Sequence, residues 1–239
     1  MSDPQPLGGS RAVAWMESKL AALGIDPTLP LPETPEPLPA LEAAQERIPV
    51  EYRAAVADHP AVLAWVRAIS EAAAAPSRGG RGRLELTTGA SLLLHGSTGR
   101  GKTYQAYGAI RALTAAGCAV RWHATTAADL YADMRPRAGV DPEWQMRHIM
   151  RVPLLLLDDL GAARTTEWTD ELTYRLINHR YSHRLPMLIT TNLPPLRTAQ
   201  VPAGQPVLRD KLGDRVLSRL AGMCELVEVT GSDRRFGAA

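Results

Sequence analysis

The chain has 239 residues, is 45% hydrophobic and carries a formal net charge of +2, which suits one α/β domain with an appendage. No apolar run reaches about 18 residues, and the N-terminus lacks the basic and apolar regions of a secretory signal. These features exclude a membrane-spanning or secreted class, so we expect a cytoplasmic protein with no membrane partner.

The charge is distributed unevenly along the chain. Residues 1–75 carry five basic and ten acidic side chains, a net charge of −5, whereas residues 76–239 carry 22 and 15, a net charge of +7. This asymmetry favours two surfaces with different partners, although two solvated faces of one protein can also differ by chance. The chain has only three lysines against 24 arginines. Lys102 therefore marks a position that favours a compact point charge.

Residues 1–78 are predicted to form a helical N-terminal segment. Apolar residues at helical spacing predict helices near 11–23, 40–47, 50–57 and 60–75. Residues 26–39 hold six prolines in fourteen positions, which favours an extended linker. We expect a domain boundary near residue 78, followed by a larger domain over residues 79–239.

From residue 84 onward, helices and strands alternate, which predicts an α/β fold with a five-stranded, mainly parallel sheet between helices. The predicted strands are 91–95, 118–123, 153–158, 186–191 and 224–229. The predicted helices are 102–116, 126–134, 141–150, 166–184 and 208–221.

A complete phosphate-binding loop follows the first of these strands. Its residues are Gly96, Ser97, Thr98, Gly99, Arg100, Gly101, Lys102 and Thr103. A strand delivers the chain to the loop and a helix begins at the Lys-Thr pair, which is the context that such a loop requires. Inward-facing N–H groups would hold phosphates, Lys102 would reach the β- and γ-phosphates, and the Thr103 hydroxyl would bind Mg²⁺.

Two acids follow a strand of four leucines, residues 154–157. Asp158 emerges at the carboxyl end of the predicted sheet, where α/β proteins bind ligands, and is expected to hold Mg²⁺ opposite Thr103. Asp159 comes one residue later and is expected to polarise the attacking water, where many such ATPases carry Glu. The alternative is an acidic turn after a strand. The pair therefore predicts a magnesium-dependent ATPase.

Two further polar positions belong to the same pattern. Asn192 ends the strand 186–191 and is expected to contact the γ-phosphate or the water, although Asn-Leu-Pro also suits a loop. Arg215 and Arg219 lie four residues apart on one helical face. An arginine there can stabilise transition-state charge at the phosphate of a neighbouring subunit, or simply belong to a solvated basic face.

The combination of motifs resembles the DnaC/IstB group of AAA+ ATPases, which comprises helicase loaders and transposition helper ATPases. The resemblance covers about residues 85–236. Besides the loop and the acids it is carried by Asn178-His179-Arg180-Tyr181, Leu185-Pro186, Thr190-Thr191-Asn192-Leu193, Gly213-Asp214-Arg215 and Ser218-Arg219-Leu220.

This resemblance implies an AAA+ P-loop fold with a reduced lid, which binds ATP and Mg²⁺ and self-associates with ATP at subunit interfaces. It implies that Asn192 acts as sensor 1 and that Arg215 is the arginine finger acting on the neighbouring subunit, with Arg219 as the fallback. Arg234 or Arg235 occupies a position that resembles sensor 2.

The leading interpretation is an ATP-dependent loader of a replicative DNA helicase onto single-stranded DNA, with the helicase bound by residues 1–78. An IstB-like transposition helper is the alternative in the same fold, and the acidic N-terminal segment weighs against it. A P-loop kinase or phosphotransferase would need an acceptor site, which the sequence does not reveal. A nucleotide-binding scaffold without turnover would not need both Asp158 and Asp159.

Overall fold

The computed structural model describes residues 46–73, 84–86, 88–119 and 121–231. The helix predicted at 11–23, the proline-rich stretch 26–39, the boundary near 78, and Arg234 and Arg235 lie outside the described residues. None of the helices in the described part of the chain is both long and apolar enough to cross a membrane.

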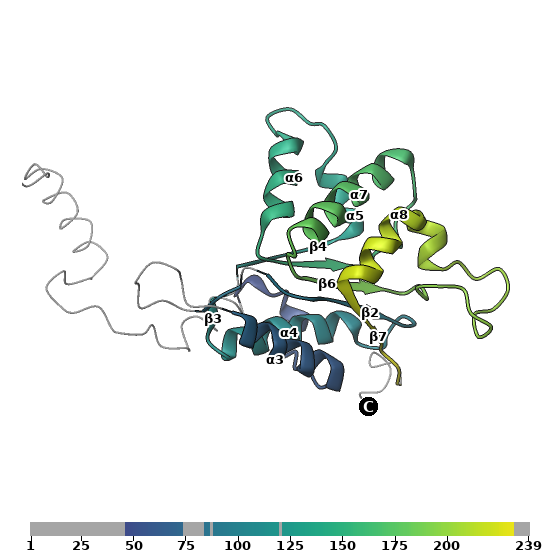
Figure 1. The fold of residues 1–239 in the computed structure, drawn as a ribbon. Helices are drawn as coiled ribbons and strands as arrows, with labels where there is room; N and C mark the ends of the chain where they lie inside the picture. Colours follow the sequence, from purple (N-terminus) through teal and green to yellow (C-terminus); the bar gives the residue numbers. More distant parts are fainter. Residues whose placement is uncertain (1–45, 74–83, 87, 120, 232–239) are drawn as a thin grey trace, which may run out of the picture. The chain divides into compact units, whose positions relative to one another are not determined.

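A sheet of five parallel strands forms the centre of the fold, in the order β4-β5-β6-β2-β7 (Figure 1). The strands are β2 (Ser91–His95), β4 (Trp122–Thr126), β5 (Leu154–Asp158), β6 (Met187–Thr191) and β7 (Cys224–Glu228). A separate parallel pair joins β1 (Leu84–Glu85) to β3 (Cys118–Ala119). The predicted α/β fold with a five-stranded parallel sheet is confirmed.

Helices cover both faces of this sheet (Figure 1). They are α3 (Pro60–Ala72), α4 (Lys102–Ala115), α5 (Ala127–Asp133), α6 (Pro142–Arg151), α7 (Glu167–Ser182) and α8 (Leu208–Met223). Leu92 and Leu94 of β2 pack with α3 and α4, whereas Leu93 packs with the helices of the other layer. Successive strand side chains point to opposite faces, so a sheet covered twice requires uninterrupted apolar strands.

The chain between residues 50 and 59 differs from the helix predicted at 50–57. It contains one 3₁₀ turn, η1 (Val50–Tyr52), and then an extended segment that crosses α4. Gln105 Oε1 of α4 accepts hydrogen bonds from the N–H groups of Asp58 and His59, both at 3.1 Å. A Cβ added to Gly108 would stand 2.4 Å from the backbone nitrogen of Ala57. The segment therefore bonds to side chains of α4 instead of closing helical hydrogen bonds of its own.

Helix α3 packs on the same core as the sheet. It begins after His59, whose Nδ1 accepts a hydrogen bond from the Ala61 N–H at 3.3 Å. Trp65 is buried within the core that contains α4, and its indole N–H donates to the carbonyl oxygen of Ala90 at 2.8 Å. Trp65 is thus a packing anchor, and residues 48–73 belong to the same compact unit as the sheet.

The predicted strand 118–123 is divided in the structure. Residues 118–119 pair with β1, and the strand that joins the main sheet is 122–126. Strand β4 lies at the edge of the sheet, and four of its five side chains are only partly buried. An edge strand needs no continuous apolar run, which explains why the sequence pattern placed this strand too early.

Arg180 of α7 is completely buried and carries no carboxylate partner among the described residues. Its guanidinium donates instead to backbone carbonyl oxygens at the end of α6 and the starts of β5 and β6, which are those of Ile149, Met150, Val152, Pro153 and Pro186, at 2.6 to 3.4 Å. Burial lowers the pKa of Arg180 to about 9, so the group remains protonated near neutral pH.

We expect Arg180→Met to destabilise the fold by roughly 3 kcal/mol or more, because buried carbonyl groups lose their donors. Arg180→Lys should be intermediate, since an ammonium group cannot match the planar fan of guanidinium donors. Urea denaturation of both variants measures this. A free energy of unfolding within about 0.5 kcal/mol of the parent for Arg180→Met would contradict it.

Candidate functional site

The predicted phosphate-binding loop lies between β2 and α4 at the carboxyl edge of the sheet. Gly101, the N-cap of α4, has a φ of 86°, a left-handed conformation that glycine adopts without steric cost. No side chain caps this helix, so its first N–H groups have no side-chain acceptor. Such a helix N-terminus is suited to bind an anion.

A chain of hydrogen bonds connects Lys102, Asn192 and Asp159. The Lys102 Nζ donates to Asn192 Oδ1 at 2.6 Å and to the carbonyl oxygen of Ser97 at 2.9 Å. The Asn192 Nδ2 in turn donates to Asp159 Oδ1 at 3.1 Å. Lys102 is buried, so its charge acts in a partly desolvated setting. The amide of Asn192 thus links the loop lysine to the second acid.

Asp158 faces the first residue pair of α4. The Thr103 hydroxyl donates to Asp158 Oδ1 at 3.0 Å, and the Thr190 hydroxyl donates to the same oxygen at 2.5 Å. Burial raises the pKa of Asp158, and the negative charge of Asp159 adds to the rise. Together they outweigh the two hydroxyl hydrogen bonds and the nearby Lys102, which act to lower it. The carboxylate therefore favours a further positive partner.

Thr190 organises both acids, a role that the sequence pattern alone did not indicate. Besides bonding Asp158, its hydroxyl oxygen accepts a hydrogen bond from the Asp159 N–H at 3.0 Å. Its carbonyl oxygen accepts another from the Leu160 N–H at 2.8 Å. Asp159 has a φ of 53°, which is uncommon for a residue other than glycine. Thr190 thus holds the backbone of Asp159 in a strained conformation at the strand end.

These side chains line one cleft of about 500 Å³. Of the predicted site residues, Thr98, Gly99, Gly101, Lys102, Thr103, Asp158, Asp159 and Asn192 contribute to its wall. Glu51 and Tyr52 also line it, and Tyr52 stacks on Tyr107 of α4 with ring centroids 4.9 Å apart. This contribution could not be predicted from the sequence, because it depends on a contact between η1 and α4.

The two candidate arginines of α8 differ in their surroundings. Arg219 donates to Asn178 Oδ1 at 2.5 Å, and its guanidinium lies 5.1 Å from the ring centroid of Tyr174. The Arg215 side chain is exposed and makes no hydrogen bond or ion pair with the described residues. Neither arginine lines the cleft of its own chain. Arg215 follows Gly213, where φ of 71° and ψ of 167° interrupt the helix.

The donor set of the cleft fits a nucleoside triphosphate with magnesium. A buried ammonium group and an uncapped helix N-terminus suit phosphate oxygens. Thr103 and Asp158 would hold Mg²⁺, because a hydroxyl and a carboxylate are hard oxygen ligands. Bound magnesium would neutralise phosphate charge.

The fold and the loop define the chain as a P-loop protein of the AAA+ class. The profile of the family described as IstB-like ATP binding protein matches residues 85–237, which is more than half of the chain. The chain belongs to this family, whose members are ATP-binding AAA+ ATPases. The resemblance to the DnaC/IstB group inferred from the motifs is confirmed.

Several solved structures are similar. The DnaC helicase loader is 26% identical, covers 76% of this chain and 100% of its own, and superposes with a TM-score of 0.57. DnaI is 21% identical, covers 84% and 94%, and has a TM-score of 0.53. A putative primosome component from Streptococcus pyogenes serotype M3 is 20% identical, covers 81% and 98%, and has a TM-score of 0.54. For DnaI and the primosome component, the similarity shown is that of the fold alone. No curated protein sequence matches the chain.

The raised pKa of Asp158 predicts how its replacement affects stability. Because the pKa of Asp158 is higher in the folded than in the unfolded protein, the stability that its neutral carboxyl group contributes is lost as the pH rises through the folded-state pKa. Asp158→Asn stays neutral and keeps an acceptor for Thr103 and Thr190. We therefore expect the variant to melt at a higher temperature than the parent at neutral pH.

The advantage of Asp158→Asn should shrink as the pH falls through the raised pKa of Asp158, because the parent carboxyl group then also becomes neutral. Thermal melts of both proteins between about pH 4 and pH 8 measure this difference. The low-pH melts serve as the internal control. The opposite result would be a melting temperature of Asp158→Asn that falls further below that of the parent at neutral pH than at acidic pH. It would show that the fold stabilises Asp158 in its charged form.

Proposed function

We propose that the chain binds ATP with Mg²⁺ in this cleft and hydrolyses the γ-phosphate bond. The proposal rests on one observation: residues from the ends of β5 and β6 and from the start of α4 line the same cleft and are joined by hydrogen bonds. These residues are Lys102, Thr103, Asp158, Asp159 and Asn192. Membership of an ATP-binding family supports ATP as the ligand of this cleft.

Each residue has a role that follows from its contacts. Lys102 donates to the β- and γ-phosphate oxygens. Thr103 and Asp158 would hold the magnesium ion, which would supply positive charge to the phosphates. Asp159 accepts the proton of the attacking water. Asn192 already forms hydrogen bonds with both Lys102 and Asp159. When Lys102 donates to a γ-phosphate instead, Asn192 loses this donor, and the same amide group binds Asp159.

The site is completed by a second copy of the chain. The Arg215 side chain is exposed, lies outside its own cleft and has no hydrogen-bond or ion-pair partner among the described residues, which suits a guanidinium that acts on a neighbouring subunit. Arg219 is bound by Asn178 and packs on Tyr174, so it is the weaker candidate. ATP would then lie at a subunit interface and favour self-association.

Mixing two inactive variants tests this shared site. Arg215→Ala and Asp159→Asn should each reduce ATP hydrolysis by roughly 100-fold or more. An equimolar mixture should recover up to about a quarter of the parent rate, because some interfaces combine an intact Asp159 with an intact Arg215. Steady-state phosphate release measures the rates.

Arg219→Ala mixed with Asp159→Asn is the matched control. It should recover no activity beyond that expected for independent subunits, because Arg219 is held within its own chain. If the mixture with Arg219→Ala recovered activity and the mixture with Arg215→Ala did not, Arg219 and not Arg215 would be the arginine finger. Full activity of Arg215→Ala alone would exclude Arg215 as the finger.

The biological role that we propose is the loading of a replicative DNA helicase onto single-stranded DNA. The similarity to the DnaC helicase loader, which extends over the whole of that structure, supports this role. The net charge of −5 over residues 1–75 suits a protein-docking segment more than a DNA-binding one. In this role ATP favours an assembly that grips helicase and DNA, and hydrolysis releases the helicase.

A transposition helper function is the second candidate. It is favoured by the family match itself, which is to IstB-like proteins over residues 85–237. In that function the same ATP site would control contacts with double-stranded DNA and a transposase. The two functions share the ATP chemistry and differ only in the partners.

Binding to purified partners separates the two functions. The full chain should co-elute with the replicative helicase of the organism that encodes it. A chain that begins at residue 46 should lose at least about tenfold in affinity, because it lacks most of the proposed docking segment. ATP binding should be unchanged, since every described residue is kept. Co-elution with the cognate transposase and not with the helicase would contradict loading and support the second candidate.

A further inference from the structure

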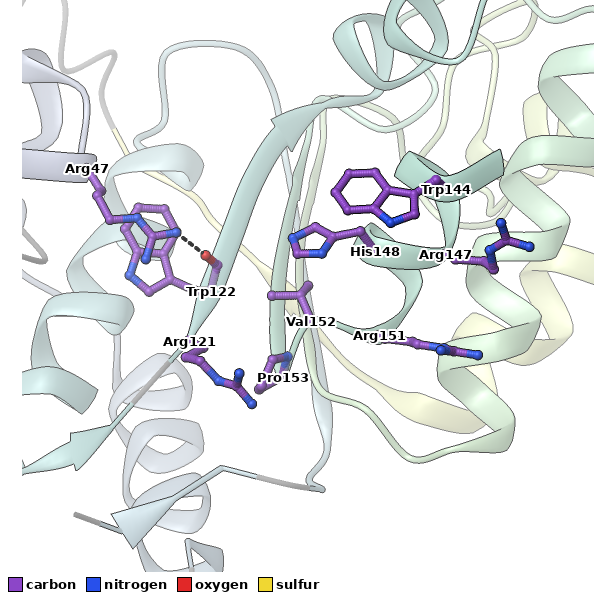
Figure 2. A pocket seen from close by; sticks show the side chains of 9 residues that line it. All are labelled: Arg47, Arg121, Trp122, Trp144, Arg147, His148, Arg151, Val152 and Pro153. Carbon is purple, nitrogen blue, oxygen red and sulfur yellow. Dashed lines mark hydrogen bonds between the residues drawn. The ribbon is translucent and has the colours of Figure 1, made fainter. Parts of the chain in front are cut away.

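A second cleft lies at the opposite edge of the sheet from the phosphate-binding loop. It is formed where β4 and β5 begin, and its volume is about 510 Å³. Trp122 and Pro153 mark the strand starts, and the last two turns of α6 form the facing wall (Figure 2). No residue of the nucleotide cleft contributes to it. We call it the basic cleft.

The basic cleft carries positive charge that the described residues do not neutralise. Arg121, Arg147 and Arg151 line it, are exposed, and make no side-chain hydrogen bond or ion pair with the described residues. None of the lining residues is acidic. The neighbouring acid of α6, Glu143, is already paired with Arg175 of α7 at 2.7 Å. These arginines therefore present free guanidinium groups, which match phosphate groups well.

An aromatic platform stands within this charged surface. Trp144 is 60% exposed, and its ring stacks on His148 with centroids 5.6 Å apart and planes 12° apart. Across the cleft, Arg47 lies 4.6 Å from the ring centroid of Trp122 and donates to its carbonyl oxygen at 2.5 Å, which fixes the opposite wall (Figure 2). The other face of the Trp144 ring is therefore available to stack on a planar ligand.

We propose that the basic cleft binds single-stranded DNA, with phosphates on the free arginines and an unpaired base stacked on Trp144. Stacking platforms combined with backbone cations are the recurring features of single-strand binding. An acidic protein would also pair with the arginines, so competition by polyglutamate is the test that separates it from DNA. A duplex keeps its bases stacked on one another and offers none to Trp144. The proposal rests on the proposed function only for the choice of DNA.

Two measurements on the full-length protein test whether single-stranded DNA binds in the basic cleft. The probe is a fluorescein-labelled oligothymidylate of about 20 nucleotides. Trp144→Ala should weaken binding about tenfold, because one stacked base is lost. The triple variant R121Q/R147Q/R151Q should lower the slope of log affinity against log salt by about 2, because roughly 0.7 counterions are released per phosphate on a single strand. Anisotropy titrations measure both.

Matched variants exclude a general effect on the surface. Trp168→Ala removes another exposed tryptophan, and Arg67→Gln removes one exposed helical arginine and compares directly with Arg147→Gln. Both controls should bind the probe as the parent does. ATP binding should be unchanged in every variant, since the two clefts share no residue. Loss of ATP binding with intact DNA binding would count against the ATP site alone.

Three outcomes would overturn the proposal. The first is equal binding by the parent, Trp144→Ala and the triple variant. The second is equal affinity for the oligothymidylate and for a duplex of the same length. The third is displacement of the probe by polyglutamate of matched charge as readily as by unlabelled oligothymidylate, which would assign the cleft to an acidic protein. Intact thermal melts of Trp144→Ala and Arg147→Gln keep each comparison valid.

Discussion

The amide of Asn192 is the contact on which the proposed site depends. It accepts a hydrogen bond from Lys102 with its oxygen and donates one to Asp159 with its nitrogen. An amide can serve both partners only if three chain segments end at the same edge of the sheet. The parallel order β5-β6-β2 supplies this, because β6 lies between the strand that precedes the acids and the strand that precedes the loop.

The same sheet separates two surfaces of different chemistry. Strand β5 has Asp158 at its carboxyl end, in the nucleotide cleft, and follows Pro153, which lines the basic cleft. Its leucines are buried on both faces, and Arg180 fixes the backbone at its start. A five-residue strand with no exposed side chain therefore connects the two clefts through the core. The separation would allow the proposed ligands, ATP and DNA, to be bound at once.

The sequence predicted Asp158 and Asn192 at one edge because the carboxyl ends of parallel strands converge there. The apolar runs that precede them also predicted the bounds of both strands to within one residue, because a strand buried on both faces needs an uninterrupted apolar sequence. The wall contributed by Tyr52 could not be predicted in the same way. It depends on Gln105 bonding a segment 46 and 47 residues away along the chain, and no local periodicity records such a contact.

ATP binding by Lys102→Ala is the most direct test of the ATP site, because this buried ammonium group is expected to bind the phosphates. Isothermal titration calorimetry with ATP and magnesium should give an affinity about 100-fold weaker than that of the parent, since a charged hydrogen-bond donor is lost. Lys211→Ala, which removes a lysine of α8 outside the cleft, should bind as the parent does. Unchanged ATP affinity in a folded Lys102→Ala protein would contradict the assignment of this cleft to ATP.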